Sequence, residues 1–378
     1  MNALQRLWDH GQSFWLDNLT RGMLRSGELA ERVREQGLRG VTSNPAIFQK
    51  AISGGEEYDG DIARFAEAGL DVREIYDRLT IADVRDACDV LREVWEASEG
   101  LDGYVSLEVS PHLAHDTEGT LREACRLYEE VDRANVLIKI PGTPEGVPAI
   151  RRALAAGVNV NVTLLFSIGA YEAVAEAYLD ALEDRLRAGS RVDDMASVAS
   201  FFLSRIDTLV DEKLEAIRED ADPAVASEVG ELLGQAAIAN AKLAYRSFRR
   251  RLTSDRWHRL AEAGARPQRM LWASTSTKDP SYSDVKYVEP LIGPLTINTM
   301  PEKTATAFVD HGTVAETVED GMEEAGRVME RLGAVGVDFD AVTDQLLEEG
   351  VEKFVVPFDR LLATLGDRVE ALAAGTRA

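Results

Sequence analysis

The chain of 378 residues carries 66 acidic and 42 basic side chains, which gives a net charge of −24. Because the acidic residues are spread along the whole sequence, this excess argues against nucleic acid or an anionic membrane as a partner. The first residues lack the apolar stretch of a secretion signal, and no run of about 18 apolar residues occurs. We therefore expect a cytoplasmic protein that does not bind a membrane.

Short apolar runs alternate along the chain with longer stretches of helical periodicity. This alternation is typical of βαβ units, in which helices cover parallel strands. Eight such runs are predicted strands, and eight strand–helix units predict an α/β fold of the (β/α)8 TIM barrel type. The predicted strands are residues 13–19, 40–44, 104–110, 136–141, 158–164, 197–203, 269–275 and 294–299.

Three segments are longer than one barrel helix requires. Residues 45–103 and 207–267 each predict several helices, and residues 302–378 look wholly helical. No Pro- or Ser-rich linker precedes this last segment, so we expect a helical extension (about 301–378) packed on the outer face of a barrel core (about 13–300). We expect one domain over residues 1–378, as a monomer or homodimer.

Polar residues share one face of several predicted strands, because side chains two apart point to the same side. In the fifth strand, valines occupy one face and Asn159, Asn161 and Thr163 the other. Glu108 and Lys139 occupy similar positions on the third and fourth strands. Polar and apolar residues would also alternate along the strands of an antiparallel sheet with one solvent-exposed face. The intervening helices instead favour a parallel barrel with its polar face inside. Barrel enzymes place catalytic groups at the carboxyl ends of such strands.

Lys139 lies in the apolar run Leu-Ile-Lys-Ile-Pro. A lysine in such a run is either a snorkelling or ion-paired structural residue, or an amine whose ammonium form is disfavoured by burial. Lys353 illustrates the structural case, because it belongs to a helical stretch. Lys139 instead shares a strand face with Glu108 and Asn161, and an amine beside acid–base groups favours Schiff-base chemistry.

Two carboxylates accompany this lysine. Asp17, on the first predicted strand, could exchange a proton with a substrate hydroxyl, or could cap the helix that follows. Glu108 could be a buried partner of Lys139, could shuttle protons through a water while the amine attacks, or could do both. Both carboxylates are therefore candidate catalytic groups.

Residues near the strand ends are candidate substrate ligands. Asn44 and Asn161 could bind sugar hydroxyls, although asparagine often caps loops. Ser200 and Arg205 belong to the sixth strand and the segment after it, and barrel enzymes often hold phosphate near their last strands. Arg205 could instead pair with Asp207 at the surface.

No motif in the sequence predicts a metal or a nucleotide cofactor. His112 and His115 are the only histidine pair worth comparing with metal sites, but they lack the spacing of a zincin or another known site. The glycine-rich nucleotide motifs and the GxSxG motif of serine hydrolases do not occur. We expect neither a metal nor a cofactor.

Five motifs occur together and in order, and their combination resembles the transaldolases, which are class I aldolases. The long variety with a helical tail, found in actinobacteria and cyanobacteria, is the most similar. The resemblance extends from Asp17 to about Thr299. The motifs are Ser13-Phe-Trp-Leu-Asp17-Asn, Gly40-Val-Thr-Ser-Asn44-Pro, Ser106-Leu-Glu108-Val-Ser, Leu137-Ile-Lys139-Ile-Pro-Gly-Thr143 and Asn159-Val-Asn161-Val-Thr163-Leu-Leu-Phe166-Ser.

This resemblance implies transfer of a dihydroxyacetone unit from sedoheptulose 7-phosphate or fructose 6-phosphate to glyceraldehyde 3-phosphate or erythrose 4-phosphate, in the pentose phosphate pathway. Lys139 would be the Schiff-base lysine and Asp17 the acid–base group that cleaves the C3–C4 bond. Glu108 and Thr163 would position a catalytic water. Other residues at family positions would contact the donor hydroxyls and the phosphate, namely Thr42, Asn44, Asn161, Ser200, Phe202 and Arg205.

One segment departs from the family pattern. Many members carry Ala-Ser-x-Arg on the seventh strand, and that arginine is a second phosphate ligand. Here the segment is Ala273-Ser274-Thr275-Ser276, so Ser274 matches and the arginine is missing. Either Lys278 reaches the phosphate as a point charge, or the site binds phosphate more weakly.

Three other functions compete with this interpretation. A simple aldolase acting on fructose 6-phosphate or a deoxy sugar phosphate would use the same lysine and release product from the donor alone. A barrel glycosidase would use Asp17 and Glu108 as its carboxylate pair and would not depend on Lys139. A barrel without catalysis would bind sugar phosphates and turn nothing over.

Overall fold

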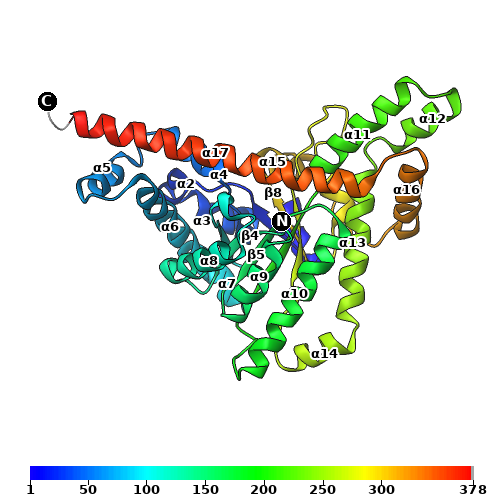
Figure 1. Cartoon of the computed structure of the whole chain (residues 1–378). Coiled ribbons are helices and arrows are strands. Elements are labelled where there is room, and N and C mark those ends of the chain that lie inside the picture. The colour runs from blue at the N-terminus through cyan, green and yellow to red at the C-terminus, as the bar shows by residue number, and fades with distance from the viewer. Residues whose placement is uncertain (376–378) are drawn as a thin grey trace.

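A computed structural model describes residues 1–375 and contains a closed barrel of eight parallel strands (Figure 1). The strands follow one another around the barrel in chain order, and the last pairs with the first. The predicted (β/α)8 barrel is confirmed, and each predicted run overlaps one strand. The strands are β1 (Gln12–Leu16), β2 (Gly40–Val41), β3 (Tyr104–Glu108), β4 (Val136–Pro141), β5 (Val160–Leu165), β6 (Ser197–Phe202), β7 (Arg269–Ala273) and β8 (Thr296–Met300).

Helices cover the outside of the barrel and fill the two long connections, each of which contains several helices as predicted. The α-helices are α1 (Ala3–Leu7), α2 (Arg21–Ser26), α3 (Glu28–Gln36), α4 (Pro45–Ser53), α5 (Asp59–Glu67), α6 (Val72–Val90), α7 (Arg92–Ala97), α8 (Thr117–Val131), α9 (Gly146–Ala155), α10 (Ile168–Arg187), α11 (Ser204–Glu219), α12 (Pro223–Leu232), α13 (Ala236–Leu252), α14 (Asp255–Glu262), α15 (Glu302–His311), α16 (Met322–Ala334) and α17 (Phe339–Gly375). Over residues 1–375, the short 3-10 helices are η1 (Trp8–His10), η2 (Pro111–Leu113) and η3 (Glu289–Leu291).

The strand register brings the polar residues of three strands together. Glu108 on β3 is the neighbour of Lys139 on β4, and Lys139 is the neighbour of Asn161 on β5. The alternating valines of β5, Val160 and Val162, are fully buried. The predicted division into an apolar face and a polar face therefore corresponds to the two sides of the barrel wall.

A buried ionic cluster closes the amino-terminal end of the barrel. Asp102 accepts hydrogen bonds from Ser13 at 2.5 Å and Trp15 at 2.9 Å, and pairs with Arg39 at 2.8 Å and Arg269 at 3.2 Å. Asp102 is fully buried and Arg269 is 3% exposed. Charges buried this deeply persist only when they are paired and hydrogen-bonded, so this cluster links β1, β7 and the segment before β3.

The helical segment after β8 differs from the expectation in two ways. Residues between α15 and α16 are not helical, so the segment is not helical throughout. Helix α17 also does not lie on the outer face of the barrel. It crosses the end at which the strands terminate, packing on α11 at one side and on α4 and α5 at the other (Figure 1). Residues 376–378 of the predicted extension lie outside the described residues.

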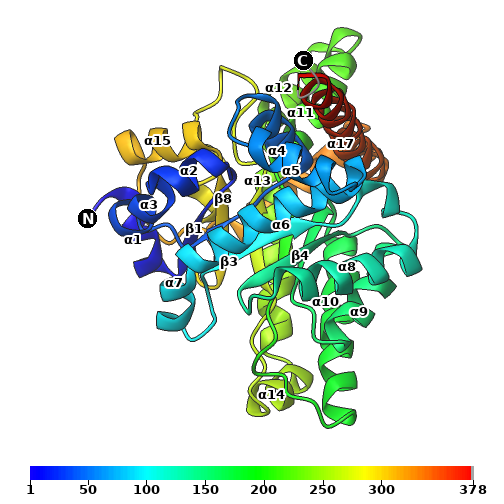
Figure 2. The ribbon, with the colours of Figure 1, turned by 90° about the vertical axis from the view of Figure 1, so that its left-hand side faces the viewer.

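When the molecule is turned by 90° from the view of Figure 1, different helices are seen at its two ends. Figure 2 shows α17 together with α4 and α12 at one end and α14 at the opposite end. One continuous apolar cluster includes residues of the barrel and of α17, such as Leu361 and Leu365. Within residues 1–375, no helix is both long and apolar enough to cross a membrane.

Candidate active site

A cavity of about 250 Å³ opens at the carboxyl ends of the strands, beneath α17. Ten of the twelve candidate residues line this cavity, and the other two, Glu108 and Asn161, lie on neighbouring strands beside Lys139. The lining also includes residues that the sequence interpretation did not select. The lining residues are Asp17, Thr42, Asn44, Lys139, Thr163, Ser200, Phe202, Arg205, Ala273, Ser274, Ser276, Lys278, Thr299, Pro301 and Phe354.

Lys139 and Glu108 form a buried ion pair. The Nζ atom of Lys139 lies 2.5 Å from Oε1 of Glu108 and donates a hydrogen bond of 3.1 Å to the carbonyl oxygen of Ser43. The two side chains are 6% and 8% exposed. Burial raises the pKa of the Glu108 carboxyl, while the nearby Lys139 ammonium opposes that rise. A carboxyl whose pKa is raised in this way can exchange a proton with the amine.

Glu108 and Thr163 retain free hydrogen-bonding capacity. Apart from the ion pair with Lys139, neither carboxylate oxygen of Glu108 has a hydrogen-bond partner among the described residues, and the same holds for Oγ1 of Thr163. Buried polar atoms normally have a partner, and exceptions often mark functional sites. These atoms can therefore bind a water or a substrate oxygen beside the amine.

Asp17 faces the cavity from the end of β1. Its Oδ1 atom accepts a hydrogen bond of 2.9 Å from Thr42, whose hydroxyl also lies 2.7 Å from that of Thr299. Burial raises the pKa of the Asp17 carboxyl, and the charge of Lys139 opposes this effect. The alternative role as a helix cap is wrong, because Thr20 caps α2.

The orientation of the Asn161 side chain is fixed by two hydrogen bonds. Its amide nitrogen donates to Ser106 at 3.0 Å, and its amide oxygen accepts from Ser200 at 2.7 Å. The side chain is fully buried. Asn44 lines the cavity and also caps α4, because its Oδ1 atom accepts from the backbone N–H of Ile47 at 3.0 Å. Asn44 therefore has the capping role that the sequence left open, and it also lines the cavity.

Two strand ends adopt a strained backbone. Leu164 has φ +62° and Ser274 has φ +56°, values that residues other than glycine rarely adopt. The register between β5 and β6 shifts between Val162 and Leu165. Such strain and irregular pairing concentrate at functional sites, where they direct side chains that regular strands could not. The hydroxyl of Ser274 lies 2.8 Å from that of Ser204, the first residue of α11.

Arg205 faces the cavity rather than the surface. Its guanidinium lies 5.3 Å from the ring centroid of Phe202, and its Nη1 atom is buried without a hydrogen-bond partner among the described residues. Burial lowers the pKa of this guanidinium. The predicted alternative pair with Asp207 is wrong, because Asp207 binds Lys286 at 3.1 Å and Tyr287 at 2.9 Å.

Lys278 is a further basic residue of the cavity and lies beside Arg205. Its Nζ atom donates to Ser276 at 2.9 Å. Burial lowers the pKa of this amine, and the neighbouring charge of Arg205 lowers it further. Two adjacent cations at one edge of the cavity suit a doubly charged anion.

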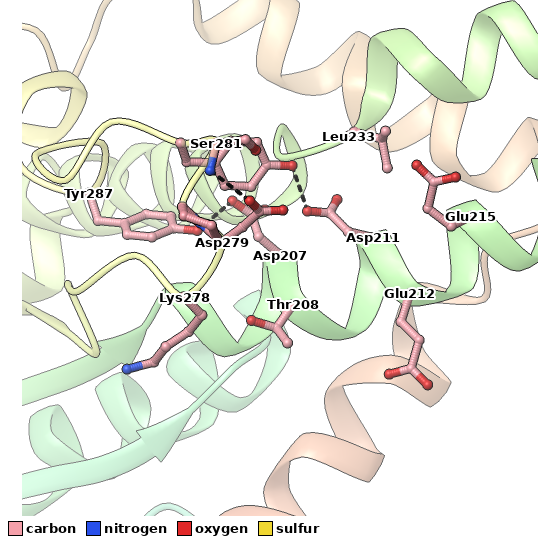
Figure 3. Close-up of a pocket in the computed structure, with 12 residues that line it drawn as sticks. Asp207, Thr208, Asp211, Glu212, Glu215, Leu233, Lys278, Asp279, Ser281 and Tyr287 are labelled. Atoms are coloured by element: carbon pink, nitrogen blue, oxygen red, sulfur yellow. Dashed lines mark hydrogen bonds between the residues drawn. The ribbon is translucent and has the colours of Figure 1, made fainter.

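A larger hollow of about 670 Å³ adjoins the cavity but has the opposite charge. Figure 3 shows the amine of Lys278 directed away from the carboxylates of Asp207 and Asp211. Asp211 accepts hydrogen bonds from Tyr282 at 2.8 Å and from the backbone of Gly234 at 2.8 Å, so it is held within the protein. An anionic substrate is repelled here and favoured in the smaller cavity. The acidic residues that line the larger hollow are Asp207, Asp211, Glu212, Glu215 and Asp279.

The histidine pair does not form a metal site. His112 lies 2.7 Å from Asp359, and His115 lies 3.1 Å from Glu145, so the two side chains have different partners. Over the described part of the chain, no group of three or more His, Cys, Asp or Glu side chains is arranged to hold a metal ion.

Thr299 and Phe354 are the most important cavity residues that the sequence interpretation missed. Thr299 had a detectable signal, because it is a polar residue at the carboxyl end of the predicted strand 294–299, where barrel enzymes place functional side chains. Phe354 had none, because a helical apolar pattern does not reveal which surface the helix covers.

Comparison with known proteins agrees with this geometry. Residues 14–365 match the family described as transaldolase/fructose-6-phosphate aldolase. Transaldolase 2 from Nostoc sp. (strain PCC 7120) is 50% identical over 377 residues, which cover 99% of each chain. Transaldolases from Trichodesmium erythraeum and Parafrankia sp. are each 49% identical, with 98% of both chains covered for the first, and 96% of this chain and 97% of the relative for the second. The chain belongs to the transaldolase/fructose-6-phosphate aldolase family.

Proposed function

We propose that this chain is a transaldolase that carries a dihydroxyacetone unit on Lys139. Transaldolases are transferases, and the donor would be sedoheptulose 7-phosphate or fructose 6-phosphate, with glyceraldehyde 3-phosphate or erythrose 4-phosphate as acceptor. The reaction belongs to the pentose phosphate pathway. The observation that carries the proposal is one buried amine at the barrel mouth with two carboxyls of raised pKa beside it.

The reaction begins with attack of the Lys139 amine on the C2 ketone of the donor. In two successive transfers Glu108 takes a proton from the nitrogen of Lys139, which starts as an ammonium, and passes it to the former ketone oxygen. The oxygen then leaves as water and a protonated imine forms. The unpartnered oxygens of Glu108 and Thr163 hold that water. Asn44 and Asn161 bind the hydroxyls of the dihydroxyacetone portion, and Ser200 keeps the Asn161 amide in one orientation.

Cleavage of the C3–C4 bond depends on Asp17. Its carboxylate takes the proton of the C4 hydroxyl, the C3–C4 electron pair moves into the protonated imine, and an aldose phosphate leaves. The remaining dihydroxyacetone unit stays on Lys139 as an enamine. Addition of this enamine to the second aldehyde, with return of the proton from Asp17, reverses the sequence. Thr42 holds the Asp17 carboxylate in position throughout.

The substrate phosphate binds at the edge of the cavity formed by Arg205 and Lys278. Arg205 lies in the first turn of α11, whose N-terminus has no side-chain cap. The positive end of a helix favours an anion, and it adds to the two side-chain charges. Ser274 and Phe202 complete this edge. Lys278 here takes the place of the arginine that many family members carry on the seventh strand.

A simple aldolase is the second candidate, because the family description includes fructose-6-phosphate aldolase. It would release free dihydroxyacetone at full rate from the donor alone, whereas a transaldolase needs an acceptor aldose phosphate. The glycosidase alternative has less support, because Glu108 is paired with Lys139. The location in the cytoplasm, the single domain over residues 1–378 and the monomeric or homodimeric state stay predictions.

Borohydride trapping tests the proposal directly. The chain contains eight lysines, of which Lys139 and Lys278 line the cavity. Reduction with borohydride in the presence of fructose 6-phosphate, followed by peptide mass spectrometry, is expected to place the adduct on Lys139. Lys139→Ala should abolish both the adduct and turnover, while Lys303→Ala, which alters an exposed lysine of α15, should change neither. An adduct on Lys278, or full turnover in Lys139→Ala, would overturn the proposal.

A further inference from the structure

Helix α17 contributes one side chain to the wall of the active site. Within the described part of this helix, Phe354 is the residue that lines the cavity. Its ring centroid lies 5.5 Å from Nζ of Lys139, and the residue is 8% exposed. The other lining residues belong to the strands and to the segments that directly follow them, so Phe354 faces the amine from the opposite side of the cavity.

Helix α17 packs closely against the barrel next to Phe354. Gly350, one turn earlier, lies against Leu164 and Phe166, and a Cβ atom at this position would lie 3.0 Å from the Leu164 side chain. The ring of Phe166 packs in turn against that of Phe202, with 5.3 Å between centroids. Helix α17 therefore packs on the strained end of β5 next to Phe354, and Phe166 connects this packing to Phe202 at the phosphate edge of the cavity.

Contacts at the far end keep α17 in place across the barrel mouth. Arg368 donates to the backbone carbonyls of Ile52 and Gly55, the second at 2.6 Å, and pairs with Asp59 at 2.5 Å. These groups belong to α4, to α5 and to the turn between them. The helix is thus attached beyond Phe354 as well as before it, and it forms a fixed roof rather than a free tail.

We infer that Phe354 is a positioning residue that decides whether the covalently held fragment is transferred or lost to water. This inference rests on the proposed imine at Lys139. A protonated imine nitrogen at the position of Nζ faces an aromatic ring, which stabilises a cation and cannot donate a proton. The same ring fills the side of the cavity from which water would reach the imine carbon. Exclusion of water protects reactive intermediates from hydrolysis.

The ratio of hydrolysis to transfer tests this role of Phe354. Fructose 6-phosphate with erythrose 4-phosphate measures transfer, and fructose 6-phosphate alone measures free dihydroxyacetone released by hydrolysis. In Phe354→Ala the ratio of hydrolysis to transfer is expected to rise roughly fivefold or more, because both the cation–π contact and the barrier to water are lost. Phe354→Leu, which keeps an apolar side chain but no ring, should give a smaller rise and guards against loss of folding.

Phe358→Ala is the matched control. Phe358 lies one turn further along the same face of α17 and is also buried, but it packs on Tyr76 with 5.3 Å between ring centroids and does not line the cavity. Its loss should weaken α17 packing, visible as a lower melting temperature, without changing the product ratio. An unchanged ratio in both Phe354 variants, or an equal rise in Phe358→Ala, would overturn the inference.

A separate readout distinguishes failure of this inference from failure of the proposed function. Borohydride trapping on the parent protein detects the imine at Lys139 independently of the ratio of hydrolysis to transfer. If the parent gives no adduct on Lys139, the proposed function fails. If the adduct forms but the ratio of hydrolysis to transfer is the same in the Phe354 variants as in the parent, only the proposed role of Phe354 fails.

Discussion

The Nζ atom of Lys139 lies 2.5 Å from the Oε1 atom of Glu108, and both side chains are almost fully buried. The ammonium form of a lysine must lose a proton before its nitrogen can attack a ketone, and in this geometry Glu108 is the group that can accept that proton. Glu108→Gln keeps the size of the side chain and removes its basicity. The rate of imine formation, followed by rapid borohydride quenching, should fall about 10²-fold or more. Glu145→Gln, at a partly exposed residue that does not line the cavity, serves as control. A rate of imine formation in Glu108→Gln equal to that of the parent would contradict the role.

Asp17→Asn should separate imine formation from bond cleavage. The amide cannot accept the proton of the C4 hydroxyl, so turnover should fall by about 10² to 10⁴. The amine and Glu108 remain, so the imine with the intact donor should still form. Mass spectrometry of the borohydride-reduced protein should then find the whole ketose phosphate on Lys139. A reduced dihydroxyacetone fragment in this variant would show that another group cleaves the bond.

The raised pKa of Asp17 predicts a pH-dependent effect on stability. Burial raises this pKa above the ordinary value of 3.8, so the folded state holds the proton more tightly than the unfolded state does. Stability is therefore lost as pH rises from 3.8 through the folded-state pKa. At pH 7, Asp17→Asn should raise the melting temperature, and the difference should vanish below pH 3.8, where the carboxyl is protonated in both states. A variant less stable than the parent at neutral pH would contradict this expectation.

Arg205 and Lys278 should contribute unequally to phosphate binding. Arg205→Ala removes a guanidinium with an unpartnered nitrogen, and KM for the donor should rise about ten- to a hundredfold, as expected for a lost hydrogen bond to a charged group. Lys278→Ala should raise KM less, because a lysine acts as a single point charge. Inorganic phosphate as a competitive inhibitor gives an independent measure. Arg191→Ala, at an exposed arginine, should leave KM unchanged.

The barrel could be predicted from the sequence because its signals are local. Alternation along β5 separated the valines from Asn161 and Thr163, and the apolar run around Lys139 marked β4 with the observed bounds. The boundaries of short strands were predicted less accurately. For example, β2 contains only Gly40 and Val41, because the chain turns at Asn44 to begin α4.

The roof of the cavity could not be predicted in the same way. The sequence around Phe354 shows a helix with an apolar face, and many surfaces of a barrel can receive such a face. The position of α17 depends on contacts such as that of Gly350 with Leu164, which join distant parts of the chain. For the same reason the sequence left open whether Arg205 would turn toward Asp207 or toward the cavity.

The ionic cluster at the amino-terminal end of the barrel also has a consequence for the order of folding. Arg269 donates a hydrogen bond of 2.6 Å to Ser13, a residue 256 positions earlier in the chain. Bringing such distant segments together carries an entropic cost before any contact compensates it. A nascent chain that has not yet produced β7 leaves the Asp102 carboxylate without its arginine from that strand, and the barrel cannot close until β8 has also been synthesised and can pair with β1. Closure of the barrel is therefore a late event in folding.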